Sequence, residues 1–140
     1  MANFVGTWED TGEREGFDEF AAAMGFSKEM TEKYRGTRHN LKYSISGNTW
    51  ILVLKSSLFP DKEKTYTFDI GKEKCDTGLE GKDIKFTVHV VSDNEINEDM
   101  KAKSDDTWKE YKVNRKVDGD RMTTMVTSAG KTMSSKQKRL

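Results

Sequence analysis

From about residue 40 to its end, the chain alternates apolar and polar residues. Side chains two apart share one face of a strand, so this alternation predicts strands with one buried face. Such strands are predicted over 41–45, 66–70, 84–90, 111–117 and 122–127. The stretch 50–54 is apolar on both faces and is interpreted as a further strand. The intervening segments are short and rich in turn residues, which is typical of an antiparallel meander.

Strands are also predicted near both ends of the chain, over about residues 4–9 and over 132–138. The segment 134–139 is polar and basic, so its pattern allows either an edge strand or a frayed tail. With these two segments the pattern amounts to about ten strands, enough to close a small barrel around one ligand.

Helical spacing is found only between the first two predicted strands. Phe17, Phe20, Ala21 and Met24 stand at i, i+3, i+4 and i+7, which predicts one short amphipathic helix. Ser27 can cap a second helix running from Lys28 to about Tyr34. A DNA-binding helix pair is disfavoured, because the second helix is short and has no basic reading face. The order of elements therefore predicts an all-β fold: a ten-strand antiparallel up-and-down β-barrel with a two-helix lid, in a single domain over 1–140.

Composition narrows the function classes. The chain has 24 Lys and Arg against 24 Asp and Glu, so no global charge attracts it to nucleic acid. Only 34% of residues are hydrophobic, which indicates a partly polar interior. There is one cysteine, Cys75, and the N-terminus has no apolar signal segment, so a cytoplasmic protein is expected.

Sequence motifs give little support to catalysis or to metal binding. His39 and His89 are far apart in the pattern, and no nucleophile, phosphate-loop or metal-ligand motif is found. We therefore expect neither an enzyme nor a bound metal or cofactor. The acidic pairs Glu9-Asp10 and Asp105-Asp106 are interpreted as solvated turns.

The opening segment resembles the intracellular fatty-acid-binding protein family, which includes the cellular retinoid-binding proteins. The resemblance covers nearly the whole chain, and its most specific parts are Phe4-Val5-Gly6-Thr7-Trp8, Gly16-Phe17-Asp18-Glu19-Phe20, Met24-Gly25 and Phe68-Asp69-Ile70-Gly71. It implies a clamshell barrel that binds a fatty acid, retinoid or similar amphipathic ligand inside and acts as a carrier. It also implies that Phe59 lies at the ligand portal, with Phe17, Phe20, Met24 and Met30 lining the side of the lid.

The chain departs from the family's pattern at the positions that hold the ligand's head group in the family. The family clamp is an arginine on the eighth strand plus an Arg-x-Tyr pair on the last, and here Ser135 and Gln137 stand at the positions of that pair. On the eighth strand, a register with Tyr111 and Val113 pointing inward places Arg115 inside. A shift by one residue would place Asn114 inside instead and would bury charged neighbours, so the Arg115 register is preferred.

Two interpretations of Arg115 remain open. Its planar guanidinium suits a carboxylate, and with Ser135 and Gln137 beside it the site offers one charge and two neutral hydrogen bonders. Alternatively, Arg115 lies at the surface or pairs with an internal carboxylate. Tyr43 and Phe68 are candidates for lining the cavity, although residues of this kind are more often part of a simple packed core.

We therefore expect a monomeric carrier of a hydrophobic ligand, a long-chain fatty acid or related lipid. A degenerate family member acting as a structural or interaction protein is the alternative, as is a barrel for a neutral retinoid or pigment-like ligand. The basic residues of the lid allow transient membrane contact, although an ordinary solvated helix face is the simpler interpretation.

Overall fold

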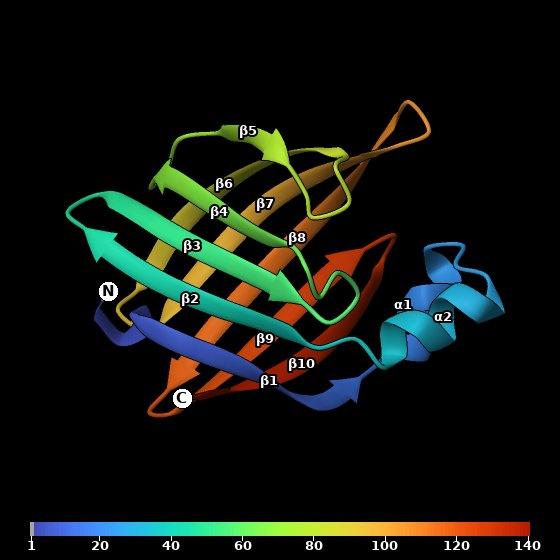
Figure 1. Ribbon diagram of the computed structural model, residues 1–140, viewed down its shortest axis with the longest axis horizontal. Helices are drawn as coiled ribbons and strands as arrows, with labels where there is room; N and C mark the ends of the chain where they lie inside the picture. The colour runs from blue at the N-terminus through green and yellow to red at the C-terminus, as the bar shows by residue number, and fades with distance from the viewer. Residues whose placement is uncertain (1) are drawn as a thin grey trace.

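The computed structural model describes residues 2–140 and has one antiparallel sheet of ten strands that curls into a nearly closed barrel (Figure 1). The strands are β1 (Gly6–Glu15), β2 (His39–Ser46), β3 (Thr49–Ser56), β4 (Glu63–Asp69), β5 (Lys74–Thr77), β6 (Asp83–Ser92), β7 (Glu95–Ser104), β8 (Thr107–Asp118), β9 (Arg121–Ser128) and β10 (Lys131–Arg139). A 3₁₀ turn, η1 (Ala2–Phe4), precedes them, and α1 (Phe17–Ala23) and α2 (Lys28–Arg35) lie between β1 and β2. The predicted fold class is confirmed.

The sheet order is β4-β3-β2-β1-β10-β9-β8-β7-β6-β5, so consecutive strands pair except β4 and β5, and β1 joins β10. The C-terminal segment is therefore an internal strand, hydrogen-bonded on both sides. Ser134, for example, lies opposite Glu15 on β1 and opposite Met125 on β9. Both expectations for 134–139, an edge strand and a frayed tail, are wrong, because its polar outer residues face solvent while both backbone edges are paired.

The pattern of hydrophobic residues did not predict two of the strands. The first, β5, has only four residues, and the second, β7, carries charged or polar residues at most positions. Met100 lies inside β7 opposite Tyr111, and the following turn falls at Asp105-Asp106 as expected.

Side chains close the barrel between β4 and β5, which are the two ends of the sheet order and share no backbone ladder within residues 2–140. The Lys64 ammonium lies 2.8 Å from the Asp76 carboxylate and donates to the Thr77 hydroxyl at 2.9 Å. The Tyr66 hydroxyl donates to the Thr77 carbonyl oxygen at 2.8 Å. This seam is therefore held by an ion pair and by hydrogen bonds that side chains of β4 donate, rather than by strand pairing.

Aromatic packing fills the end of the barrel where η1 lies, opposite the helices (Figure 1). Phe4 contacts the rings of Tyr43 and Trp50, and Trp50 contacts Phe68. The Trp8 indole N–H donates to the Phe4 carbonyl oxygen at 3.0 Å, and both side chains are fully buried. Trp8 is thus a structural residue, as its sequence position beside Phe4 indicates.

The helical lid covers the other end (Figure 1). The apolar stripe of α1 is buried through Phe17, Phe20 and Ala21, and Met24 follows at the cap. In contrast, α2 has no buried residue in its described length, although Ser27 caps it by accepting a hydrogen bond from the Met30 N–H as predicted. No helix within residues 2–140 is long and apolar enough to cross a membrane.

Gly16 sets how closely the lid approaches β10. It begins α1 with φ 69°, and a Cβ built there would lie 2.6 Å from the Thr132 carbonyl oxygen. Gly47, in the β2–β3 turn, has a similar φ of 62°, but a Cβ there would meet no atom within 4 Å. The two positions therefore share the backbone strain and differ only in the clash.

We expect Gly47→Ala to lower the free energy of unfolding by about 1–2 kcal/mol, the cost of a left-handed backbone at a non-glycine residue. Gly16→Ala should cost clearly more, because the lid must also move off β10. Urea unfolding of both variants measures this difference. Equal losses in the two variants would contradict the close approach of lid and strand.

Candidate ligand-binding site

Arg115 lies on the inner face of β8. Its neighbours Val113 and Val117 are buried, and the Arg115 side chain is only 14% exposed. Asn114 points to the opposite face, where its amide donates to Glu95 and Asn97 at 2.8 Å. The register with Arg115 inside is therefore the one the structure adopts.

A row of polar side chains crosses the inner wall at Arg115. The Arg115 Nε lies 3.5 Å from the Glu98 carboxylate, and its Nη1 donates to the Thr124 hydroxyl at 3.0 Å. Thr124 donates to the Gln137 amide oxygen at 2.8 Å, and the Gln137 amide nitrogen donates to the Ser135 hydroxyl at 2.9 Å. We call Glu98, Arg115, Thr124, Gln137 and Ser135 the inner polar row; it spans β7 to β10.

Strand register explains why these residues meet. Arg115 lies directly opposite Thr124 on β9, and Thr124 lies directly opposite Ser135 on β10. Glu98 lies opposite Val113, one inward position before Arg115. Inward positions on adjacent strands are close enough for long side chains to reach diagonally, so the antiparallel pairing alone brings one acid and one base together.

Arg115 is positively charged in this setting. Burial works to lower its pKa, but the neighbouring Tyr43 and Glu98 outweigh burial, and the pKa lies above its usual value. The alternative that Arg115 pairs with an internal carboxylate is the arrangement observed. Only two of its five N–H donors make hydrogen bonds within the described residues.

Tyr43 adds an unused hydrogen-bonding group, which lies within the electrostatic influence of Arg115 and Glu98. Its side chain is 1% exposed, and its hydroxyl has no hydrogen-bond partner among residues 2–140. Burial raises the pKa of Tyr43 strongly. Arg115 lowers this pKa and Glu98 raises it, both by less than burial does, so the hydroxyl is protonated. An unpartnered buried hydroxyl costs about 1–3 kcal/mol.

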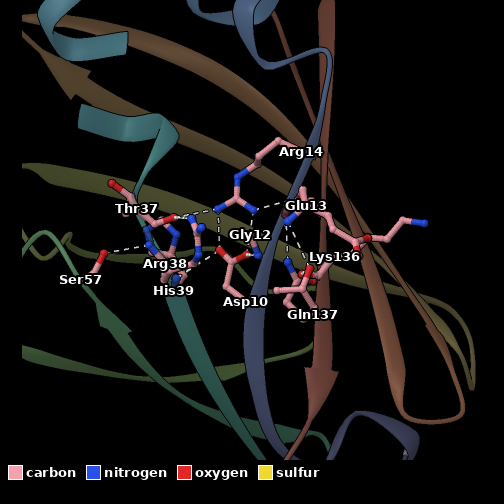
Figure 2. A network of polar contacts seen from close by, with 12 residues as sticks. Asp10, Gly12, Glu13, Arg14, Thr37, Arg38, His39, Ser57, Lys136 and Gln137 are labelled. Atoms are coloured by element: carbon pink, nitrogen blue, oxygen red, sulfur yellow. Dashed lines mark hydrogen bonds and ion pairs between the residues drawn. The ribbon is translucent and has the colours of Figure 1, made fainter. Parts of the chain in front are cut away.

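A second buried ion pair joins β1 to the start of β2 (Figure 2). The Arg14 guanidinium makes a bidentate contact with Asp10, at 2.6 and 2.8 Å, and also donates to the Thr37 carbonyl oxygen at 2.9 Å. The backbone N–H groups of Gly12 and His39 donate to the same carboxylate. The Asp10 side chain is 2% exposed, so its interpretation as part of a solvated turn is wrong. It belongs to the inward-facing positions of β1.

The electrostatics of Asp10 follow from these contacts. Burial works to raise its pKa, but the hydrogen bonds from Arg14 and from the Gly12 N–H outweigh burial, and the pKa is below its usual value. The carboxylate is therefore charged in the folded protein. It lies opposite Gln137 in the β1–β10 ladder, which connects this ion pair to the inner polar row.

The remaining predicted site residues differ in how deeply they are buried. Tyr43 and Phe68 belong to the aromatic core, while Phe17, Phe20 and Met24 are buried beneath the lid. Phe59 is half-buried in the β3–β4 loop, where the Lys62 ammonium lies over its ring, and Tyr111 is half-buried on β8. Met30 is 41% exposed, so in this structure it adds little apolar contact beneath the lid.

Glu98 and Thr124 were not predicted as site residues. Glu98 lies on the strand that the hydrophobic pattern missed, and Thr124 is a small residue in an ordinary alternation. The sequence feature that could have identified Glu98 is the alternation Ile96, Glu98, Met100 on β7, which places a carboxylate at an inward position.

Comparisons with known proteins agree with the fold. No protein-family model matches the chain. The chain is 31% identical to fatty acid-binding protein type 2 of Fasciola hepatica over 127 residues, which cover 91% of this chain and 90% of that protein. It is 25% identical to a fatty acid-binding protein of Clonorchis sinensis over 127 residues, with 91% and 90% covered.

Solved structures give the same result for the fold. The Schistosoma mansoni fatty acid binding protein in complex with arachidonic acid matches with a TM-score of 0.80 at 24% identity, covering 100% of this chain and 98% of that one. As-p18, an extracellular fatty acid binding protein, matches with a TM-score of 0.85 at 19% identity, covering 99% and 97%.

A ten-strand barrel with a two-helix lid and a polar group on its inner wall defines a class of lipid-binding barrels. With the similarity to the Fasciola hepatica protein, the chain belongs to the fatty acid-binding protein family. The resemblance found in its sequence is confirmed.

The Asp10–Arg14 pair yields a prediction for stability. Asp10→Asn keeps the shape but leaves a largely buried guanidinium without a counter-charge, so the free energy of unfolding at pH 7 should fall by about 3 kcal/mol. Glu9→Gln is the matched control, because the neighbouring Glu9 side chain is 42% exposed. It should change stability by less than about 0.5 kcal/mol.

The pH dependence of this difference has a defined sign. Because the pKa of Asp10 is lowered by folding, its contribution is fully present above the unfolded value of about 3.9 and is lost as pH falls through the folded value. Urea unfolding of wild type and Asp10→Asn between pH 7 and pH 2 should therefore show converging stabilities. A difference that stays constant across this range would contradict the assignment.

Proposed function

We propose that this protein binds one long-chain fatty acid or related lipid inside the barrel and carries it as a non-enzymatic, monomeric, cytoplasmic protein. The observation that carries the proposal is Arg115, a charged side chain on the inner wall with most of its donors unused. The family membership and the name of the Fasciola hepatica relative support a lipid as the ligand class.

The inner wall divides into parts suited to the two ends of such a ligand. Apolar and aromatic inward residues would hold the hydrocarbon tail, at roughly 25 cal/mol for each Å² removed from water. The inner polar row would receive the head group, because a buried polar group must find hydrogen-bond partners. We propose that Phe17, Phe20, Met24 and Met30 of the lid, with Phe59 and Tyr111, surround the chain of the ligand near its entry.

We also propose that the lid meets membranes transiently during ligand transfer. The support is that α2 is an exposed surface with Lys28, Lys33 and Met30 on it. Its other cation, Arg35, is already paired with Asp18 and Glu32. The remaining charge is modest, so such contact would be weak and salt-sensitive.

A second candidate is a barrel for a neutral retinoid or pigment-like ligand. Glu98 favours it, because this carboxylate already neutralises Arg115. A third candidate is a protein that has lost ligand binding and acts through interactions with other molecules. No feature of the inner wall supports it specifically, and the binding test below distinguishes it from a carrier.

The test is displacement of Nile red, an uncharged fluorescent probe, from delipidated protein by oleic acid and by oleyl alcohol. We expect saturable displacement at one ligand per protein. Arg115→Gln should weaken binding of both ligands by about tenfold or more, the value of one charge-assisted hydrogen bond. Lys112→Gln, on the outer face of the same strand, is the control and should leave both affinities unchanged.

Circular dichroism of each variant shows whether it is folded. If the folded wild-type protein binds neither lipid, the carrier proposal is wrong and an interaction protein is favoured. If Arg115→Gln binds both lipids as well as wild type does, the carrier proposal stands and the head group lies elsewhere.

A further inference from the structure

The charges that face the expected head-group position sum to zero. Glu98 and Arg115 supply one of each sign, and their side chains are only 11% and 14% exposed. The next inward pair along the wall, Asp10 and Arg14, is also neutral and is bound at 2.6 Å. The inner polar row contributes no further charge, because Thr124, Gln137 and Ser135 are uncharged.

A ligand carboxylate would upset this balance. It would approach Arg115 while Glu98 still holds the same guanidinium, which places two anions beside one cation in a partly buried site. Like charges repel strongly where water cannot screen them. The carboxylate could compensate only by displacing Glu98, which would leave a second buried anion without its partner.

The free hydrogen-bonding groups have the opposite character: they suit a head group that both donates and accepts. Glu98 accepts only through Oε1 among the described residues, so its second oxygen is open to a donor. Arg115 has unused donors, and the Tyr43 hydroxyl has no partner in residues 2–140. A hydroxyl or a primary amide can donate to Glu98 and accept from Arg115 or Tyr43, whereas an ionised carboxylate can only accept.

We infer that Glu98 is a specificity-determining residue that makes this site select an uncharged, hydrogen-bonding head group, such as that of a fatty alcohol, monoacylglycerol or fatty amide, over a free carboxylate. The inference rests on the proposed function, because it concerns a ligand held inside the barrel. It narrows the ligand class of the same site to lipids whose head group carries no charge.

The experiment compares three ligands that share one 18-carbon chain: oleyl alcohol, oleamide and oleic acid. Their affinities are measured at pH 8 by displacement of Nile red, so that the acid is ionised. In the wild-type protein, oleamide and oleyl alcohol should each bind at least tenfold more tightly than oleate.

The charge of Glu98 is then removed by Glu98→Gln, which keeps the side-chain length. The released Arg115 should bind oleate at least tenfold more tightly relative to oleamide than in wild type. Glu98→Asp, which keeps the charge, should retain the wild-type ratio. Asp99→Asn is the control, because Asp99 follows Glu98 on β7 but is exposed on the outer face.

The outcomes separate the inference from the proposed function. Tighter binding of oleate than of oleamide by wild type overturns the inference, even if Glu98→Gln does not fold. A ratio that is the same in wild type and in folded Glu98→Gln also overturns it. In both cases the carrier function stands, whereas absence of binding of all three ligands by the folded wild-type protein would remove the proposed function itself.

Discussion

Charge inside a barrel must be neutralised inside the barrel, and this requirement organises the inner wall of the protein. Within residues 2–140, two buried ion pairs satisfy it, Glu98 with Arg115 and Asp10 with Arg14, and a partly exposed third pair, Lys64 with Asp76, lies at the seam. Each has its own place and consequence, since the first forms the expected head-group position, the second joins β1 to the start of β2, and the third closes the seam between β4 and β5. The aromatic core needs no such pairing and fills the end of the barrel opposite the helices.

The backbone fold and the side chains on the inner wall have to be considered separately. The fold matches that of the Schistosoma mansoni protein over the whole chain at 24% identity, so very different side chains fill the same frame. The inward side chains on β7 to β10 determine what a ligand's polar end would meet. Ser135 and Gln137 offer neutral hydrogen bonds there, and Glu98 balances the charge of Arg115.

The sequence predicted those parts of the structure that depend on periodic burial. The stripe of Phe17, Phe20 and Met24 predicted a buried helix face, and the alternation around Val113 and Val117 predicted that Arg115 points inward; the structure has both features. The strand β7 could not be recognised, because the inward Glu98 interrupts its apolar positions. Asp10 was misread for a similar reason, since its partner Arg14 and the contacts from the start of β2 exist only after folding.

The most direct measurement is a crystal structure of the protein grown with a saturating 18-carbon lipid. The account predicts electron density for a single chain inside the barrel, with its polar end within hydrogen-bond distance of Arg115 and Tyr43 and the Glu98–Arg115 contact retained. Density for the lipid only on the outer surface, or a head group at the seam or under the lid and away from Arg115, would contradict it.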